Sequence, residues 1–203
     1  MAIGFVPMII RWRNCVYESV TEHYGIPIAD IDMVMGSLEH SLASTGGFCV
    51  GRSYVVGHQR LAGLGYCFSA SLPPLLATAA SEALRIMQSE PQRLSRTKEL
   101  ALAAHTGLKE ALTDTRFQVY GFTENPSKHI GYDGPKEEAD KKLDALVDTL
   151  FEKYSVMITR ARYLEEDELY DIRPSARFIV QYDLSDGELS TAIRAVKEVA
   201  HQL

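Results

Sequence analysis

Two serines, Ser69 and Ser71, lie in the short segment Phe68–Pro74, where their hydroxyls could contact a phosphate. Short hydroxyls and loop N–H groups donate hydrogen bonds to phosphate oxygens without adding bulk. The same residue types are also typical of a turn at the start of a helix, where serines cap the first N–H groups. The residues by themselves leave both interpretations open.

A second chemical feature is a glycine-rich loop between two short strand signals. The apolar run Met33–Met35 predicts a strand that breaks at Gly36–Ser37, and a loop of small residues then leads to Gly46–Gly47. The loop contains His40 but no lysine, and the first lysine of the chain is Lys98. A lysine amine forms an imine with an aldehyde cofactor, whereas an imidazole cannot form that stable linkage. No residue before Lys98 can therefore supply such an imine.

The histidines and cysteines do not predict a metal site. The pairs Cys49/Cys67 and His40/His58 lack the spacing of metal ligands, so we expect no metal. A lone loop histidine such as His40 is usually solvent-facing or hydrogen-bonded, and a cofactor or catalytic role is the alternative. The three cysteines are an odd number without C-x-x-C spacing, which favours a reducing compartment over disulfides.

Composition indicates a soluble globular chain. Of its 203 residues, 46% are hydrophobic and 24% are charged, with a net charge of −6. No basic patch stands out, so nucleic acid is not an expected partner. The N-terminal apolar run Met1–Ile10 is interrupted by Gly4 and Pro7 and is about half the length that a spanning helix needs. We therefore expect neither a signal peptide nor a transmembrane segment in this chain.

The pattern of predicted helices and strands changes near residue 90. Residues 1–89 alternate short strand signals with helical segments and predict part of a larger α/β domain, whereas residues 90–203 predict a small, compact α+β domain. The expected helices are Val16–Tyr24, His58–Ala62, Pro74–Gln88, Leu94–Leu112, Glu137–Tyr154 and Asp186–Gln202. The expected strands are Ile31–Met35, Gly47–Val50, Ser53–Val56, Phe117–Phe122, Val156–Ala161 and Ala176–Tyr182, with Tyr66–Ser71 extended and a short strand possible within Asn125–Pro135. Ser185, with Glu188 three residues later, predicts a capping box.

Four segments together resemble the α-oxoamine synthase family of pyridoxal 5′-phosphate (PLP) enzymes. They are the glycine-rich loop, Thr21–Gly25, Gly65–Pro74, and Ile158–Leu164 with Pro174–Arg177. Within that family the chain is similar to the first, long-chain-base subunits of serine palmitoyltransferases, over about Val20–Leu203. The resemblance implies a fold type I α/β architecture, namely the C-terminal part of the large domain followed by the small domain.

The same resemblance assigns roles to individual residues. His40 stands where the family has the lysine that binds PLP, which implies a subunit without a catalytic residue. Ser69 and Ser71 match the segment that reaches the PLP phosphate of the partner subunit. Arg177 matches an arginine that holds a substrate carboxylate, with a simple salt bridge as the alternative. The residues that pair the pyridine nitrogen and stack on the ring would lie upstream of this sequence.

The function implied by the resemblance is that of a non-catalytic subunit of serine C-palmitoyltransferase. Its partner would be the lysine-bearing catalytic subunit, which would provide most of the contacts to PLP. The complex would condense serine with palmitoyl-CoA at the cytoplasmic face of the endoplasmic reticulum membrane. Two alternatives stay open: an active homodimeric α-oxoamine synthase, or a scaffold or regulatory fragment without contact to an active site.

Overall fold

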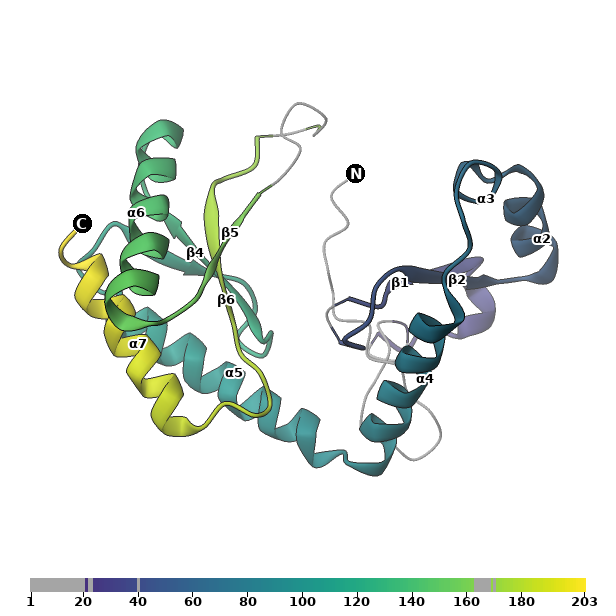
Figure 1. Ribbon diagram of the computed structural model, residues 1–203, viewed down its shortest axis with the longest axis horizontal. Helices are drawn as coiled ribbons and strands as arrows, with labels where there is room; N and C mark the ends of the chain where they lie inside the picture. The colour runs from purple at the N-terminus through teal and green to yellow at the C-terminus, as the bar shows by residue number, and fades with distance from the viewer. Residues whose placement is uncertain (1–20, 22–23, 40, 163–168, 170) are drawn as a thin grey trace. The chain divides into compact units, whose positions relative to one another are not determined.

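The computed structural model describes residues 21, 24–39, 41–162, 169 and 171–203. Contacts divide the chain into two compact units, one ending at Pro91 and the other running from Gln92 to Leu203 (Figure 1). Each unit is described by itself. Among the described residues, none of the helices combines the length and the apolar character that a membrane span needs.

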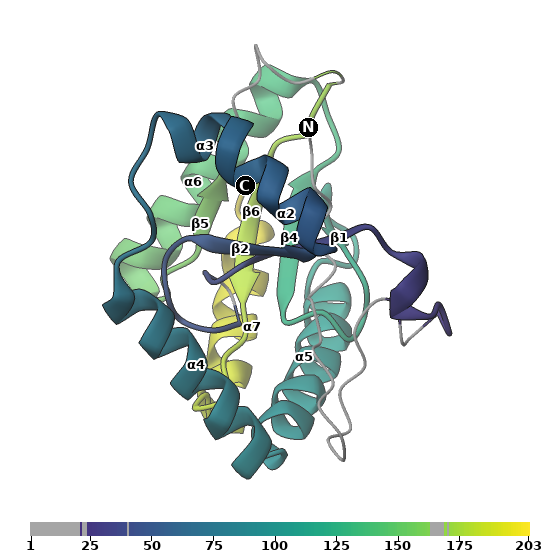
Figure 2. The same cartoon turned by 90° about the vertical axis from the view of Figure 1, so that its right-hand side faces the viewer.

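The first unit is built on an antiparallel hairpin. Strand β1 (Met33–Ser37) pairs with β2 (Gly47–Gly51), with Met33 opposite Gly51 and Ser37 opposite Gly47. The 3-10 turn η1 (Ile28–Asp30) precedes the hairpin, and the helices α2 (Ser53–Ala62), α3 (Leu64–Cys67) and α4 (Pro74–Ser89) follow it. Figures 1 and 2 show the hairpin between the α2–α3 pair and α4.

A small apolar core holds the hairpin loop against α4. The buried side chains are Leu38, Leu42 and Ala80, and they pack with Phe48, Leu72, Ala83, Leu84 and Met87. Helix α4 begins at Pro74, as predicted, because proline suits a first helical turn whose N–H groups have no partner. Ala83 and Leu84 lie three and four residues after Ala80, and Met87 lies three residues after Leu84, so one face of α4 carries this contact.

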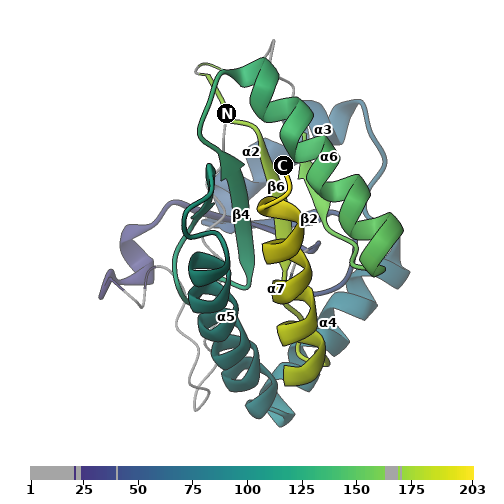
Figure 3. The ribbon, with the colours of Figure 1, turned by 90° about the vertical axis from the view of Figure 1, so that its left-hand side faces the viewer.

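The second unit is a four-stranded antiparallel sheet covered by three helices. Its strands are β3 (Phe117–Tyr120), β4 (Ser127–Tyr132), β5 (Thr159–Ala161) and β6 (Ser175–Ile179), in the order β3-β4-β6-β5. Its helices are α5 (Gln92–Ala111), α6 (Lys136–Tyr154) and α7 (Asp186–Ala200). Figures 1 and 3 show all three on the same face of the sheet.

The core of this unit lies between the sheet and the helices. Phe117, Ile130, Ala176 and Phe178 come from the strands, and the helices contribute a larger set of fully buried leucines and valines. That set includes Leu100, Leu108, Leu143, Leu146, Leu150, Val196 and Val199. Burial of each large apolar side chain contributes about 1.5–3 kcal/mol to stability. The core therefore fixes which face of the sheet is left without helices.

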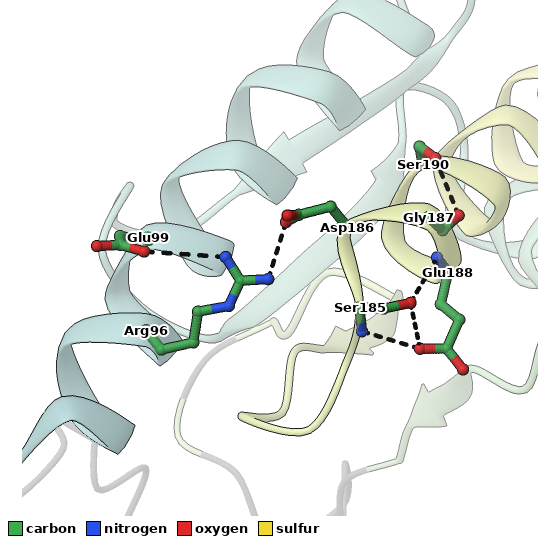
Figure 4. Close-up of polar contacts among 7 residues, drawn as sticks. All are labelled: Arg96, Glu99, Ser185, Asp186, Gly187, Glu188 and Ser190. Carbon is green, nitrogen blue, oxygen red and sulfur yellow. Dashed lines mark hydrogen bonds and ion pairs between the residues drawn. The ribbon is translucent and has the colours of Figure 1, made fainter.

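The start of α7 is secured by polar contacts (Figure 4). The Ser185 hydroxyl accepts from the Glu188 backbone N–H at 3.2 Å, and the Glu188 carboxylate accepts from the Ser185 N–H at 2.8 Å, which confirms the predicted capping box. The Ser185 hydroxyl also donates to the Glu188 carboxylate at 2.6 Å, and this bond, with the one from the Ser185 N–H, holds the pKa of Glu188 below its usual value. Arg96 of α5 lies 2.9 Å from the Asp186 carboxylate, so an ion pair links the two helices.

Two predicted elements were wrong. Residues Ser53–Val56, expected as a strand, form the first turn of α2, where the N–H groups of Val55 and Val56 donate to the Arg52 carbonyl. The strand preference of valine depends on a neighbouring strand, and here the helical continuation supplies the backbone partners instead. The segment expected to be extended from Tyr66 begins inside helix α3, since the Cys67 N–H donates to the Gly63 carbonyl.

The other predicted elements lie within a few residues of the observed ones. Strand β5 is shorter than expected, because it begins at Thr159 rather than Val156. The short strand expected within Asn125–Pro135 is β4, which lies between β3 and β6 in the sheet. The helix expected over Val16–Tyr24 falls mostly outside the described residues.

Candidate functional site

Close contacts require glycine at positions 46 and 47, where the β1–β2 loop leads into β2. Gly46 has φ +101°, and a Cβ at this position would lie 2.6 Å from Leu72 Cδ1. A Cβ at Gly47 would lie 2.8 Å from the Gly36 carbonyl oxygen. A larger residue at either position would push apart the hairpin or the segment that carries Leu72. The glycine pattern therefore reflects packing within this unit.

Side-chain hydroxyls organise the same loop. The Ser37 Oγ accepts from the Glu39 N–H at 3.1 Å, and the Ser44 hydroxyl donates to the Leu76 carbonyl of α4 at 2.9 Å. The Leu38 N–H donates to the Gly46 carbonyl at 3.0 Å. These bonds organise the described part of the loop and link it to α4. His40 itself lies outside the described residues.

Ser69 and Ser71 lie in the stretch between α3 and α4, and both are exposed. Within the described part of the chain, no hydrogen bond to either hydroxyl is found. The N-cap of α4 is Pro73, and no side chain bonds to the first N–H groups of this helix. The serines therefore do not act as helix caps here, and their hydroxyls are available to an external acceptor.

Large apolar side chains flank these serines in the sequence and face solvent. Leu61, Leu64, Phe68 and Leu75 each expose more than three quarters of their surface. Exposed apolar side chains of this size are typical of surfaces that bind another protein. The serine-bearing stretch thus combines free polar donors with apolar side chains.

A second set of polar residues lies on the helix-free face of the four-stranded sheet. Tyr120 is opposite His129, His129 is opposite Arg177, and Arg177 is opposite Thr159. Residues directly opposite in a sheet point to the same face, so these four side chains form one row across four strands. We call this set the polar row. The alternate residues Ile130 and Phe178 point into the core, which places the polar row on the other face.

Arg177 has unused hydrogen-bonding capacity. Its Nε is buried without a hydrogen-bond partner, and its guanidinium forms no ion pair with another described residue. The salt-bridge alternative therefore has no partner among the residues that the structure describes. A guanidinium in this state is suited to a carboxylate, which it can bind with two parallel hydrogen bonds.

His129 is partly buried beside Arg177 and is held by a neighbouring hydroxyl. Its Nδ1 lies 2.9 Å from the Ser175 Oγ, and Ser175 is itself buried. Burial, together with the positive charge of Arg177, lowers the pKa of His129. The imidazole is therefore neutral near pH 7 and adds no repulsion to the arginine.

Lys128, next in sequence, faces the opposite way and has a structural role. Its side chain is fully buried, and its Nζ donates to the carbonyls of Phe122 and Thr123 at 3.0 and 2.7 Å. Burial lowers its pKa to about 8. The charges of Lys128 and Lys109 act with burial to lower the pKa of His105, whose Nδ1 is buried without a partner.

Sequence reasoning missed the polar row apart from Arg177. Strand alternation in Ser127–Tyr132 could have separated His129 from Lys128 and Ile130. It could not have placed Tyr120 and Arg177 beside His129, because that depends on strand register. Within the described ranges no cluster of histidine, cysteine or acidic side chains is arranged to hold a metal.

Comparison with known proteins agrees with this architecture. The model of the aminotransferase class I and II family matches residues 17–196. The chain is 31% identical over 187 residues to serine palmitoyltransferase 1 of Dictyostelium discoideum, and 32% identical over 198 residues to long chain base biosynthesis protein 1 of Arabidopsis thaliana. These alignments include 89% and 92% of this chain but only 39% and 38% of the two relatives.

A solved structure shows the same fold. The serine palmitoyltransferase from S. paucimobilis, bound to a PLP–myriocin aldimine, aligns with a TM-score of 0.71 and 22% identity, over 91% of this chain and 43% of that one. The similarity confirms the expected fold type I architecture. This chain belongs to the aminotransferase class I and II family.

Proposed function

We propose that this chain contributes to a serine C-palmitoyltransferase as a non-catalytic subunit that completes the active site of a lysine-bearing partner. The complex would condense L-serine with palmitoyl-CoA to 3-ketosphinganine, the first step of sphingolipid synthesis, at the endoplasmic reticulum membrane. The names of the relatives from D. discoideum and A. thaliana support the reaction. Any membrane contact of this chain would come through its partners or through sequence outside it.

The observation that carries the proposal is the lack of lysine before Lys98. The whole unit that contains the glycine-rich loop therefore has no side-chain amine, and His40 occupies the position expected for one. When bound, PLP supplies an electron sink for carbanion chemistry. The residues of this unit fit a contact to its phosphate but do not fit a covalent link to its aldehyde.

Ser69 and Ser71 are the proposed phosphate contacts. Their hydroxyls are exposed, have no partner in the described part of the chain, and lie among exposed apolar side chains suited to a subunit interface. In the assembled complex they would donate to the phosphate of PLP held by the partner. Arg177 is the proposed contact for the carboxylate of the amino-acid substrate.

Co-expression tests the proposal. We expect no serine palmitoyltransferase activity from this chain alone, none or little from the lysine-bearing partner alone, and full activity from the two together. Activity of the chain alone would favour the homodimeric synthase instead. A partner that is equally active without this chain would favour the scaffold or regulatory fragment.

Covalent labelling provides an independent check. Borohydride reduces an imine between PLP and a lysine to a stable amine, which peptide mass spectrometry detects. After reduction of the chain mixed with PLP, we expect no pyridoxyl group on the peptide that contains His40. A modified residue in that peptide would contradict the non-catalytic assignment.

A further inference from the structure

The polar row contains more anion-binding capacity than Arg177 alone. Next to Arg177 on the same sheet face, the imidazole of His129 uses Nδ1 for its contact to Ser175. Its Nε2 forms no hydrogen bond with another described residue. Arg177 and His129 are direct cross-strand partners, so one small anion can reach both side chains.

Gly131 shapes the surface of the sheet beside Arg177 and His129. A Cβ at Gly131 would lie 2.4 Å from Tyr120 Cε2, so the Tyr120 ring lies across Gly131 on the face of the polar row. The Tyr120 hydroxyl donates to the Gln118 Oε1 at 3.2 Å. Gly131 thus leaves room for a ring that closes one side of the row beside His129.

We propose that His129, oriented by Ser175, is a second donor to the same carboxylate that Arg177 binds. The inference rests on the proposed role of Arg177, and it extends the site to two residues, His129 and Ser175, to which the family resemblance assigned no role. Ser175 acts as a positioning residue, because it touches His129 and not the ligand. The ligand class is a small amino acid with one free carboxylate.

The tautomer of His129 explains how Ser175 acts. A neutral imidazole has one N–H donor and one acceptor nitrogen. When the Ser175 hydroxyl donates to Nδ1, the proton must be on Nε2, which then faces the ligand as a donor. Without the hydroxyl, the ring is free to place its proton on Nδ1 and to present an acceptor, which repels a carboxylate.

The charge of the row sets the ligand class. With His129 neutral, the guanidinium of Arg177 is the single positive charge of the row, and it matches one carboxylate. The row contains no acidic side chain that would compete for the arginine. An amide in place of the carboxylate loses the charge that Arg177 attracts, so it should bind far more weakly.

The test measures ligand binding and the tautomer of His129 in the full chain. At 22.6 kDa the chain is suited to solution NMR with 15N-labelled histidine, and His129→Gln identifies the His129 signals. The probes are L-serine and, as the uncharged control, L-serinamide. We expect the free chain to hold His129 in the Nε2–H form, L-serine to shift the Nε2 signal without changing the tautomer, and L-serinamide to leave the His129 signals unchanged.

Single-residue variants distinguish the roles of Arg177, His129 and Ser175. Arg177→Gln should abolish the shift. Ser175→Ala, which removes one hydroxyl from a buried site, should weaken L-serine binding by about threefold to tenfold and raise the share of the Nδ1–H form. Ser127→Ala is the matched control, because Ser127 lies on the same strand face but bonds neither His129 nor Ser175, and it should leave binding unchanged.

Two results would overturn the inference. One is L-serine binding that needs Arg177 but leaves the His129 signals and the Ser175→Ala affinity unaltered. The other is no L-serine binding by the wild-type chain. Both are distinguishable from failure of the proposed function, which is read from the activity of the co-expressed subunits and not from ligand binding to this chain.

Discussion

Gly46 packs against Leu72, the residue that directly follows Ser71. A Cβ at Gly46 would come within 2.6 Å of Leu72 Cδ1, and the backbone of Gly46 has φ +101°. The glycine-rich loop and the serine-bearing stretch therefore support each other within one unit. The position of Ser69 and Ser71, the proposed phosphate contacts, therefore depends on the absence of a side chain at Gly46.

Gly46→Ala should destabilise the chain by about 1–3 kcal/mol, because it combines a strained φ with a steric clash. Urea unfolding measures this change. Gly57→Ala is the matched control, since Gly57 lies in helix α2 and a Cβ added there would meet nothing within 4 Å, and it should raise stability by about 0.5–1 kcal/mol. Equal effects of the two changes would contradict the packing role of Gly46.

Replacement of both Ser69 and Ser71 by alanine should weaken PLP retention by the assembled complex. A hydrogen bond to a charged phosphate contributes about 1.5–3 kcal/mol, which is about tenfold to a hundredfold in affinity. PLP titration of the reconstituted complex measures the change. The melting temperature of this chain should stay the same, because neither hydroxyl caps α4.

Ser81→Ala is the control for the serine pair. Its hydroxyl donates to the Ala77 carbonyl within α4, so it has no role toward an external phosphate. PLP retention should be unchanged in this variant. A double variant at Ser69 and Ser71 with normal PLP affinity and a lowered melting temperature would remove the support for a contribution to the partner's site.

Lys128 should make the stability of the chain increase with pH between about 8 and 10. Its folded-state pKa is about 8, below the usual value of 10.5, so the unfolded chain binds more protons in this window. Unfolding therefore becomes less favourable as pH rises, by at most about 3 kcal/mol. The two carbonyl contacts favour the charged amine and reduce this gain.

Urea unfolding at several pH values tests the effect of Lys128. Lys128→Met should abolish the increase, whereas Lys141→Met, at an exposed position of α6, should preserve it. The measurement stays below pH 10, because the raised pKa values of Tyr132 and Tyr154 lower stability at higher pH. A pH-independent stability of the wild-type chain would show that the amine of Lys128 titrates normally.

Ser185→Ala should cost about 1 kcal/mol of stability, since it removes the cap at the start of α7. Thermal unfolding measures the loss. Ser190→Ala, one turn later, removes only a hydroxyl bonded to the Gly187 carbonyl and should change stability by less than half as much. Equal melting temperatures of the Ser185→Ala and Ser190→Ala variants would show that the cap contributes little to stability.

Much of the architecture could be predicted from local patterns. Helices α4 to α7 carry apolar residues at helical spacing, and Pro74 and Ser185 mark two of their starts, so each signal lies within a few neighbouring residues. Ser53–Val56 was one of two exceptions, because a valine-rich segment suits either a strand or a helix and only its backbone partners decide between them.

The sequence by itself determined that no residue before Lys98 has a side-chain amine, and the proposed non-catalytic role rests on this fact. The sequence also contained the residues of the polar row. Only the tertiary structure brought Tyr120, His129 and Arg177 together. The strand of Arg177 is far along the chain from the other two, and a shift of one residue in register would turn each side chain to the other face. The burial of Lys128 and the contact of Gly46 with Leu72 were decided in the same way, by packing between segments that local sequence patterns do not connect.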